Sequence, residues 1–277
     1  MNTLLINKCR FSPDLDLDQL LEMNSGVERT EIGSENMFAP GSFVPRQDWR
    51  CPTGSVLDRW LRAAEDAPIS EQVYIFRLDE APLLEFWDRL EVAELQRSPA
   101  FATSSSTHAA QPLIQFITDF ALINARECSA TLVANRGGLR STTYSTVAKA
   151  FIGLHLDQLH AMDLSDHSSA DIRLGINLGN EVRHLVLGQI PASQMGDALG
   201  KASYQVARLF ARSRDGLTRA FFEKCADLPL MRIALPPGYG YILSTQNVIH
   251  DGDATQIHGL DLNLLVRASV SGVHSFN

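Results

Sequence analysis

The spacing of hydrophobic and polar residues divides the chain into an N-terminal part with mixed patterns and a C-terminal part rich in strand patterns. Apolar residues recur at helical spacing over 55–64 and 81–95, where positions three and four apart share one face of a helix. Between these segments, residues 72–78 (QVYIFRL) alternate as a short strand does. We therefore predict a mixed, partly helical N-terminal layer over 1–127.

The segment 98–111 (SPAFATSSSTHAAQ) is small and polar, which is typical of a loop. Such a loop could close over a binding site as a lid or simply connect two elements. Residues 112–125 return to a helical pattern, so a further helix is predicted after the loop.

From residue 128 onward, segments rich in β-branched residues are separated by Gly, Asp and Asn, which is typical of strands joined by turns. No internal repeat or linker divides the chain. The pattern predicts a mainly β, α+β protein with a single domain over 1–277, in which residues 128–277 form a β-barrel or sandwich with a helical insertion at about 193–225. The predicted strands cover 129–138, 139–157, 171–191, 231–235, 240–249 and 260–271, and the inserted helices cover about 193–212 and 217–225.

Composition narrows the class of protein. The chain has 277 residues, 45% hydrophobic and 20% charged, and it lacks the roughly 20 consecutive apolar residues that would cross a bilayer. The N-terminus has no secretory signal pattern, so we expect a cytoplasmic location. A net charge of -8 disfavours nucleic acid, which needs clustered Lys and Arg, and indicates a small-molecule partner. The four cysteines lie far apart without CxxC spacing, which argues against a disulfide framework or a thiolate zinc site.

A candidate metal site begins with His155-Leu156-Asp157 at the end of a strand pattern. Residues two apart on a strand point to the same face, so both side chains can reach one ion. An imidazole and a carboxylate suit Fe(II), and a second imidazole would complete a 2-His-1-carboxylate triad with open positions for other ligands. The triplet alone is weak evidence for a metal site, because a surface His near a solvated carboxylate gives the same His-x-Asp sequence.

His250 is the best candidate for the third ligand. It follows the apolar segment 241–249 and precedes Asp251-Gly252-Asp253, which we interpret as a turn. A ligand at the end of a strand beside a turn would lie at the mouth of a barrel. The other histidines fall in predicted loops, a hairpin or the C-terminal tail. Of these, His258 remains an alternative to His250. The other candidates considered are His167, His184, His258 and His274.

With these residues the sequence resembles the Fe(II)/2-oxoglutarate-dependent dioxygenases of the double-stranded β-helix fold. The resemblance rests on His155-x-Asp157, on His250 some 93 residues later (250 minus 157), and on Arg267-Ala268-Ser269. It implies a jelly-roll or cupin-like barrel with supporting helices, Fe(II), 2-oxoglutarate and dioxygen. Local similarity points to a clavaminate-synthase-like branch of bacterial small-metabolite hydroxylases and lies in Gly138–Thr143, Arg173–Gly179 and Asn247–Gly252.

The resemblance also implies a co-substrate site. In the family, a strand Arg beyond the distal His pairs with the distal carboxylate of 2-oxoglutarate, often with a hydroxyl two residues on; Arg267 and Ser269 match, and Thr143 is expected to contribute. A guanidinium presents a fork of donors to a carboxylate. Arg267 could instead be a surface charge. Its distance of 17 residues from His250 (267 minus 250) exceeds the commonest family spacing, which leaves Arg173 or Arg183 as alternative anchors.

The expected reaction is oxidation of an unactivated C–H bond of a small polar metabolite, such as an amino acid or a derivative. The presence of Asp157 implies hydroxylation rather than halogenation, because halogenating relatives lack that ligand. Arg140, Thr142 and Tyr144 are candidate substrate contacts, although strand propensity explains the threonines equally well.

Residues near the histidines in sequence could hydrogen-bond to their rings and fix which nitrogen carries the proton, and we prefer none of them over the others. The candidates are Gln158, Asn177, Asn247 and Asp251.

Two other classes of protein use similar residues. A zinc-dependent hydrolase could bind its metal with the same three ligands, but no HExxH helix is present. A non-catalytic β-barrel binding protein would carry the histidines incidentally. Metal analysis separates the binding protein from the enzymes, and turnover of 2-oxoglutarate separates the oxygenase from the hydrolase.

Overall fold

The structure is a computed structural model of the chain. It describes residues 5–8, 15–30, 38–61, 69–89, 101–104, 112–113, 115, 129–157, 169–202, 205–206, 208–209 and 216–271. Strands predominate and helices are fewer, which confirms a mainly β, α+β protein. Among the helices in these ranges, none has the length and apolar character to cross a membrane.

The strands and helices have the following bounds. The strands are β1 (Leu5–Lys8), β2 (Leu21–Met23), β3 (Val27–Arg29), β4 (Phe38–Pro45), β5 (Gln72–Arg77), β6 (Phe101–Ser104), β7 (Ser129–Arg136), β8 (Tyr144–Ser145), β9 (Ala150–Gly153), β10 (Ser169–Asn177), β11 (Arg183–Gly188), β12 (Leu230–Leu235), β13 (Tyr239–Leu243), β14 (His250–Asp253) and β15 (Leu260–Ser271). The helices are α1 (Leu17–Leu20), α2 (Gly54–Trp60), the 3-10 helix η1 (Ile69–Glu71), α3 (Glu80–Arg89), α6 (Ala192–Leu199) and α8 (Gly216–Lys224).

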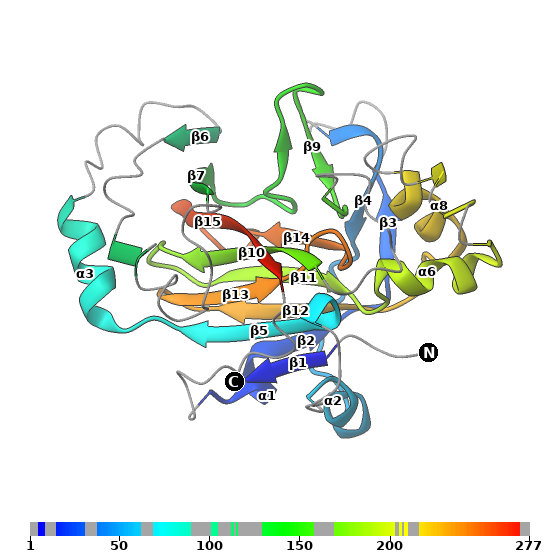
Figure 1. Cartoon of the computed structure of the whole chain (residues 1–277), viewed down its shortest axis with the longest axis horizontal. Coiled ribbons are helices and arrows are strands. Elements are labelled where there is room, and N and C mark those ends of the chain that lie inside the picture. Colours follow the sequence, from blue (N-terminus) through cyan, green and yellow to red (C-terminus); the bar gives the residue numbers. More distant parts are fainter. Residues whose placement is uncertain are drawn as a thin grey trace.

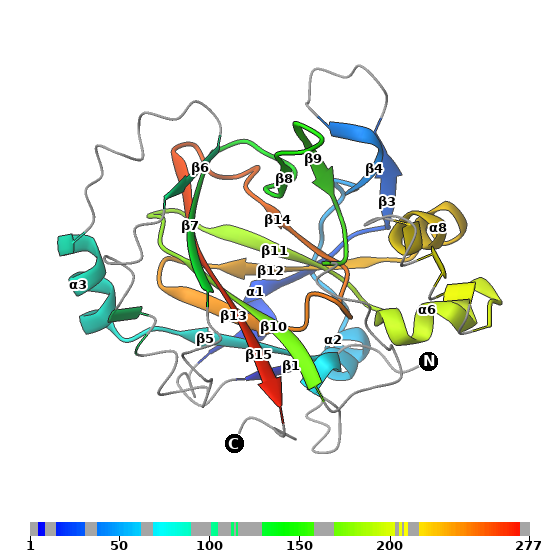
Figure 2. The ribbon, with the colours of Figure 1, turned by 45° about the horizontal axis from the view of Figure 1, so that its top comes forward.

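The strands form three sheets. The long sheet has the order β1-β5-β13-β10-β15-β7-β6, the second sheet β14-β11-β12-β2, and the third sheet β3-β4-β9-β8. In both ribbon views α6 and α8 lie next to each other on the side of β3 and β4, and α3 lies at the opposite side (Figures 1 and 2). The described strands do not close into a barrel.

The main hydrophobic core lies between the long and second sheets. Leu185 and Ile233 of the second sheet belong to the same buried cluster as Ile75 and Leu243 of the long sheet. On the other face of β11, Val186 packs in a second cluster with side chains of α6, α8 and β4. Both faces of β11 are therefore covered, which explains why every residue of this strand is buried.

The predicted elements of the N-terminal part are largely found. The helical patterns at 55–64 and 81–95 correspond to α2 and α3, and the strand pattern at 72–78 to β5. This part also supplies strands to all three sheets. The prediction that 98–111 is only a loop was wrong in part, because β6 pairs with β7 in register. Most of the predicted helix at 112–125 lies outside the described residues.

The predicted C-terminal strands are largely found, with corrections around the candidate metal site. His155 and Asp157 lie beyond the end of β9, and residues 244–249, which were predicted as strand, lie between β13 and β14. Asp251-Gly252-Asp253 is not a turn but part of strand β14, where it pairs with β11. On the other side of β14, His250 forms an isolated bridge with His155, and Ala254, the residue after β14, forms another with Leu139. These bridges bring the chain beyond β9 and beyond β7 to the edge of the second sheet.

Candidate metal centre and pocket

His155, Asp157 and His250 converge although 93 residues separate the last two (250 minus 157). One ligand atom from each lies within 4.8 Å of the other two. The backbones of His155 and His250 exchange hydrogen bonds of 3.2 and 3.0 Å, and their ring centroids lie 4.5 Å apart. Nε2 of His155 lies 3.7 Å from Oδ1 of Asp157. The three predicted metal ligands therefore form one group.

Both imidazoles are oriented so that Nε2 is the ring nitrogen available to bind a metal ion. Nδ1 of His155 contacts the carbonyl of Gly153 at 2.8 Å, and Nδ1 of His250 contacts that of Val248 at 3.0 Å. Because a carbonyl only accepts, each Nδ1 carries a proton, and the neutral form of each ring then has its lone pair on Nε2. Both Nε2 atoms are buried without a hydrogen-bond partner, which is costly unless a cation fills the space between them. The donor set therefore fits a metal ion.

The electrostatics of the group favour the metal-binding protonation states. Burial and the neighbouring His155 lower the pKa of His250 to about 3, so its imidazole is neutral near pH 7. Burial alone would raise the pKa of Asp157, but the guanidinium of Arg173, the nearby imidazoles and a hydrogen bond with Thr245 hold it at about 2. A neutral imidazole and an ionised carboxylate are the forms that bind metals.

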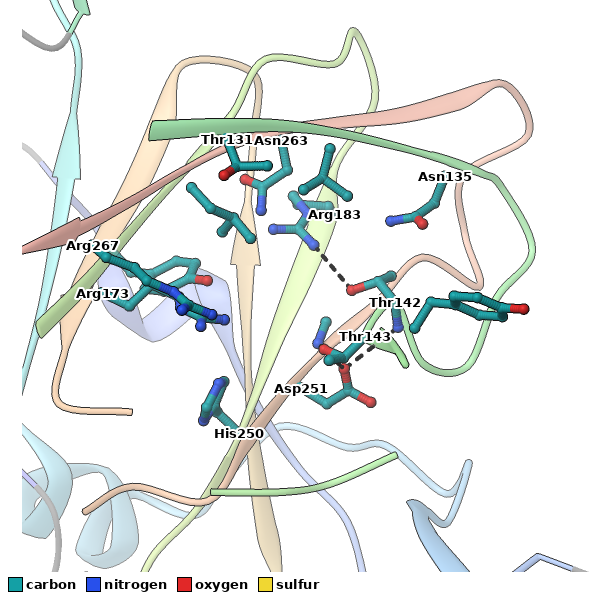
Figure 3. A pocket seen from close by; sticks show the side chains of 15 residues that line it. Thr131, Asn135, Thr142, Thr143, Arg173, Arg183, His250, Asp251, Asn263 and Arg267 are labelled. Atoms are coloured by element: carbon teal, nitrogen blue, oxygen red, sulfur yellow. Dashed lines mark hydrogen bonds between the residues drawn. The ribbon is translucent and has the colours of Figure 1, made fainter. Parts of the chain in front are cut away.

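A pocket of about 340 Å³ opens beside His250. Its walls come from β7, β10, β11, β13, β14, β15 and the segment 142–144. Figure 3 shows Arg173 and Arg267 side by side on one wall, and Arg183 on another between Asn263 and Thr142. The lining residues are Thr131, Val133, Asn135, Thr142, Thr143, Tyr144, Arg173, Arg183, Tyr241, His250, Asp251, Gly252, Asn263, Leu265 and Arg267.

The predicted co-substrate residues are placed as follows. Arg267 on β15 lines the pocket and lies opposite Arg173 of β10 in the strand register. Thr143 lines the pocket and donates a hydrogen bond of 2.9 Å to Oδ1 of Asp251. Ser269 belongs to β15, and its side chain lies outside the described part of the structure.

Two of the three predicted substrate contacts reach the pocket. Thr142 and Tyr144 line it. Arg140 is not among the lining residues; its guanidinium donates to Oε1 of Glu28 at 2.6 Å and to the carbonyl of Pro45 at 2.7 Å. Arg140 thus ties the segment that carries the threonines to β3 and β4.

The wall opposite Arg267 is a buried polar network. Nε of Arg183 donates to Oδ1 of Asp261 at 3.0 Å, and Nδ2 of Asn135 lies 3.4 Å from Oδ2 of the same carboxylate. Burial raises the pKa of Asp251 to about 6, against the pull of His155 and of hydrogen bonds from Thr143 and Gly252. Arginine and carboxyl side chains therefore lie together on this wall.

The alternative residues do not join the metal group. His184 is buried on the opposite face of β11 among Arg232 and Asp253. His258 is exposed and contacts Glu181 at 3.2 Å. Asn177 and Asn247 donate to the backbone carbonyls of Leu235 and Ser70. His167, His274 and Gln158 lie outside the described residues.

Arg173 has a different partner in the structure from the one that the sequence suggests. The guanidinium of Arg173 forms an ion pair with Asp157, whereas the sequence had suggested Arg173 as a possible anchor for 2-oxoglutarate. An arginine within the mostly apolar sequence 171–178 is a signal of a buried partner. The identity of that partner depends on tertiary contacts and cannot be read from the strand.

No protein-family model matches the chain, and no curated protein matches its sequence. Among solved structures, the Kdo hydroxylase KdoO, a non-heme Fe(II) alphaketoglutarate dependent dioxygenase, aligns with 13% identity and a TM-score of 0.43 over 79% of this chain and 84% of that chain. The non-heme alpha ketoglutarate dependent epimerase SnoN from nogalamycin biosynthesis aligns with 11% identity and a TM-score of 0.36 over 73% and 82%. Likeness at this level does not assign a family, so the functional argument rests on the site itself.

Proposed function

We propose that the protein is a non-haem Fe(II)/2-oxoglutarate-dependent oxygenase that oxidises an unactivated C–H bond of a small polar metabolite. The observation that carries the proposal is the pair of buried Nε2 atoms without a hydrogen-bond partner, grouped with an ionised carboxylate within 4.8 Å. Two imidazoles and one carboxylate, with further positions open, are the ligand set of this class of iron site.

His155, Asp157 and His250 would hold the metal, and the carbonyls of Gly153 and Val248 keep both Nε2 atoms turned toward it. Iron with 2-oxoglutarate supplies oxidation of a C–H bond by dioxygen, coupled to conversion of 2-oxoglutarate into succinate and carbon dioxide. The surrounding burial excludes water from the ligands, because both imidazoles are only 1% and 3% exposed.

Arg267 is the proposed anchor of 2-oxoglutarate, with Ser269 and Thr143 contributing hydroxyls. Arg267 lines the same pocket as His250, so a dicarboxylate could span from the metal to its guanidinium. Arg173 and Arg183, which form ion pairs with Asp157 and Asp261, remain the alternative anchors.

The substrate is proposed to contact Thr142 and Tyr144, with Arg140 acting on it only through the segment that it holds. A pocket of about 340 Å³ is at the small end of the range for ligand sites, which supports a small metabolite such as an amino acid or a derivative. The two facing sheets are compatible with a double-stranded β-helix core. Membership of the clavaminate-synthase-like branch stays a prediction.

Anaerobic addition of Fe(II) and then 2-oxoglutarate tests the proposal. We expect the weak visible charge-transfer band of the metal chelate in the wild-type protein and its loss in His155→Ala. A protein without the band, or a band that survives in His155→Ala, would refute the oxygenase. Tight Zn(II) binding without consumption of 2-oxoglutarate would instead indicate the hydrolase, and absence of metal binding would indicate the non-catalytic binding protein.

A further inference from the structure

Arg173 is a buried arginine in the middle of the long sheet, 7% exposed. Strand β10 runs between β13 and β15, where Arg173 is paired in register with Leu243 on one side and Arg267 on the other. Hydrogen bonds on both edges of β10 therefore fix the backbone from which this guanidinium extends toward the metal group.

The guanidinium of Arg173 engages one oxygen of Asp157 and leaves the other toward the histidines. NH2 of Arg173 pairs with Oδ2, while Oδ1 lies 3.7 Å from Nε2 of His155. The backbone of Asp157 is held separately, because its N–H donates to the carbonyl of Thr245 at 2.8 Å. The ion pair, together with the hydrogen bond from the side chain of Thr245 to the same carboxylate, therefore restrains the rotation of the carboxylate rather than the position of the chain.

The position of Arg173 is costly without a specific role. Like charges directly opposite each other on adjacent strands are destabilising, and Arg267 lies opposite Arg173. Nε of Arg173 is also buried without a hydrogen-bond partner. Well-packed apolar residues generally stabilise an interior as well as a buried ion pair does, so stability alone does not account for an arginine here.

We propose that Arg173 is a positioning residue that holds Asp157 in a one-oxygen binding mode. With Oδ2 engaged by the guanidinium, only Oδ1 is available to the metal. The coordination position that a second carboxylate oxygen would fill then stays open for exchangeable ligands. The inference rests on the proposed function for the identity of those ligands, but the restraint on Asp157 can be measured with a metal alone.

Co(II) titration without 2-oxoglutarate tests this role, since Co(II) is stable in air and its visible absorption reports the coordination number. We compare Arg173→Gln with Arg59→Gln, which removes an exposed arginine of α2. Loss of an outer partner of a metal ligand typically weakens metal binding about 10–100-fold. We expect such a loss, with an altered Co(II) spectrum, in Arg173→Gln and wild-type behaviour in Arg59→Gln.

A second titration separates positioning from direct binding of the co-substrate. With Co(II) bound, 2-oxoglutarate should bind more weakly to Arg267→Gln than to Arg59→Gln. If Arg173→Gln binds Co(II) like the wild type and weakens only 2-oxoglutarate, Arg173 is itself the anchor and the proposal is overturned.

If Arg173→Gln does not fold, the same Co(II) titration is made with Arg173→Lys. Lysine keeps the charge but lacks the planar fork of donors, so we expect a smaller loss of Co(II) affinity and a shifted spectrum; wild-type values for both would overturn the proposal. Failure of the oxygenase proposal is distinguishable, because a wild-type protein without a 2-oxoglutarate chelate can still show the Co(II) effect of Arg173→Gln.

Discussion

At the scale of single residues, the pocket contains contacts so close that they leave no space for an added side-chain atom. Gly252 follows Asp251 on β14 and lies against Thr142 and Arg183. A Cβ added at Gly252 would overlap Oγ1 of Thr142 and come within 2.6 Å of NH2 of Arg183. The absence of a side chain here lets two walls of the pocket meet.

Gly252→Ala should therefore be destabilising. Overpacking of a tight interior typically costs about 1–3 kcal/mol, because Thr142 and Arg183 must both shift, and we expect a loss of this size in urea unfolding. Gly54→Ala is the matched control: a Cβ at Gly54, at the start of α2, meets nothing within 4 Å, so this variant should be neutral or slightly stabilised. Equal stability of the two variants would contradict the tight contact at Gly252.

At the scale of elements, the metal group depends on how the chain leaves β9. Gly153 has a φ of 69°, in the left-handed region, and a Cβ there would overlap the carbonyl oxygen of Phe43. This turn ends β9 and directs His155 to β14, where the two backbones form an isolated bridge. His155 and Asp157 therefore lie beyond the end of β9 and not within a strand.

Gly153→Ala should lower both stability and metal affinity. The left-handed backbone costs a residue with a Cβ about 1 kcal/mol or more, and the overlap with Phe43 adds to this and displaces His155. Gly200→Ala isolates the backbone effect, since Gly200 has a φ of 65° and open space around it. We expect weaker Co(II) binding only in Gly153→Ala; unchanged Co(II) affinity there would show that the turn does not position the ligand.

The sequence indicates the three residues of the candidate metal group better than the elements that carry them. His155, Asp157 and His250 are proposed as ligands from residue chemistry and spacing, and this inference does not depend on exact element boundaries. Asp251-Gly252-Asp253 was interpreted as a turn because Asp and Gly favour turns locally, but pairing with β11 satisfies this backbone as a strand. Likewise β6 was missed, because its small polar sequence becomes a strand only through β7.

At the scale of the whole molecule, the second sheet is buried on both faces, and polar residues on its outer face are enclosed as well. His184 on β11 is 3% exposed and Arg232 on β12 is 3% exposed. NH1 of Arg232 contacts Oδ2 of Asp253 at 3.3 Å, and the guanidinium carbon lies 4.5 Å from the ring centroid of Trp49. Because His184 is a titratable group enclosed on this face, the stability of the fold depends on pH.

Burial and the charge of Arg232 lower the pKa of His184 to about 4 in the folded protein, despite the opposing charge of Asp253. In the unfolded chain, a histidine has a pKa of about 6.5. Because the folded value is the lower one, the unfolded state takes up the proton first as pH falls. The contribution of neutral His184 is therefore complete above about pH 6.5 and is lost progressively down to about pH 4.

Urea unfolding at pH 7 and pH 5, with a chelator present to exclude metal-linked titration, measures this loss. These two pKa values give a loss of about 2 kcal/mol between the two pH values from His184 alone. In His184→Gln the pH dependence should be smaller by that amount, because glutamine does not titrate. His258→Gln, which removes an exposed side chain, should keep the wild-type slope. If His184→Gln keeps it too, the pH dependence of folding originates elsewhere, and enclosure of the outer face of the second sheet does not control it.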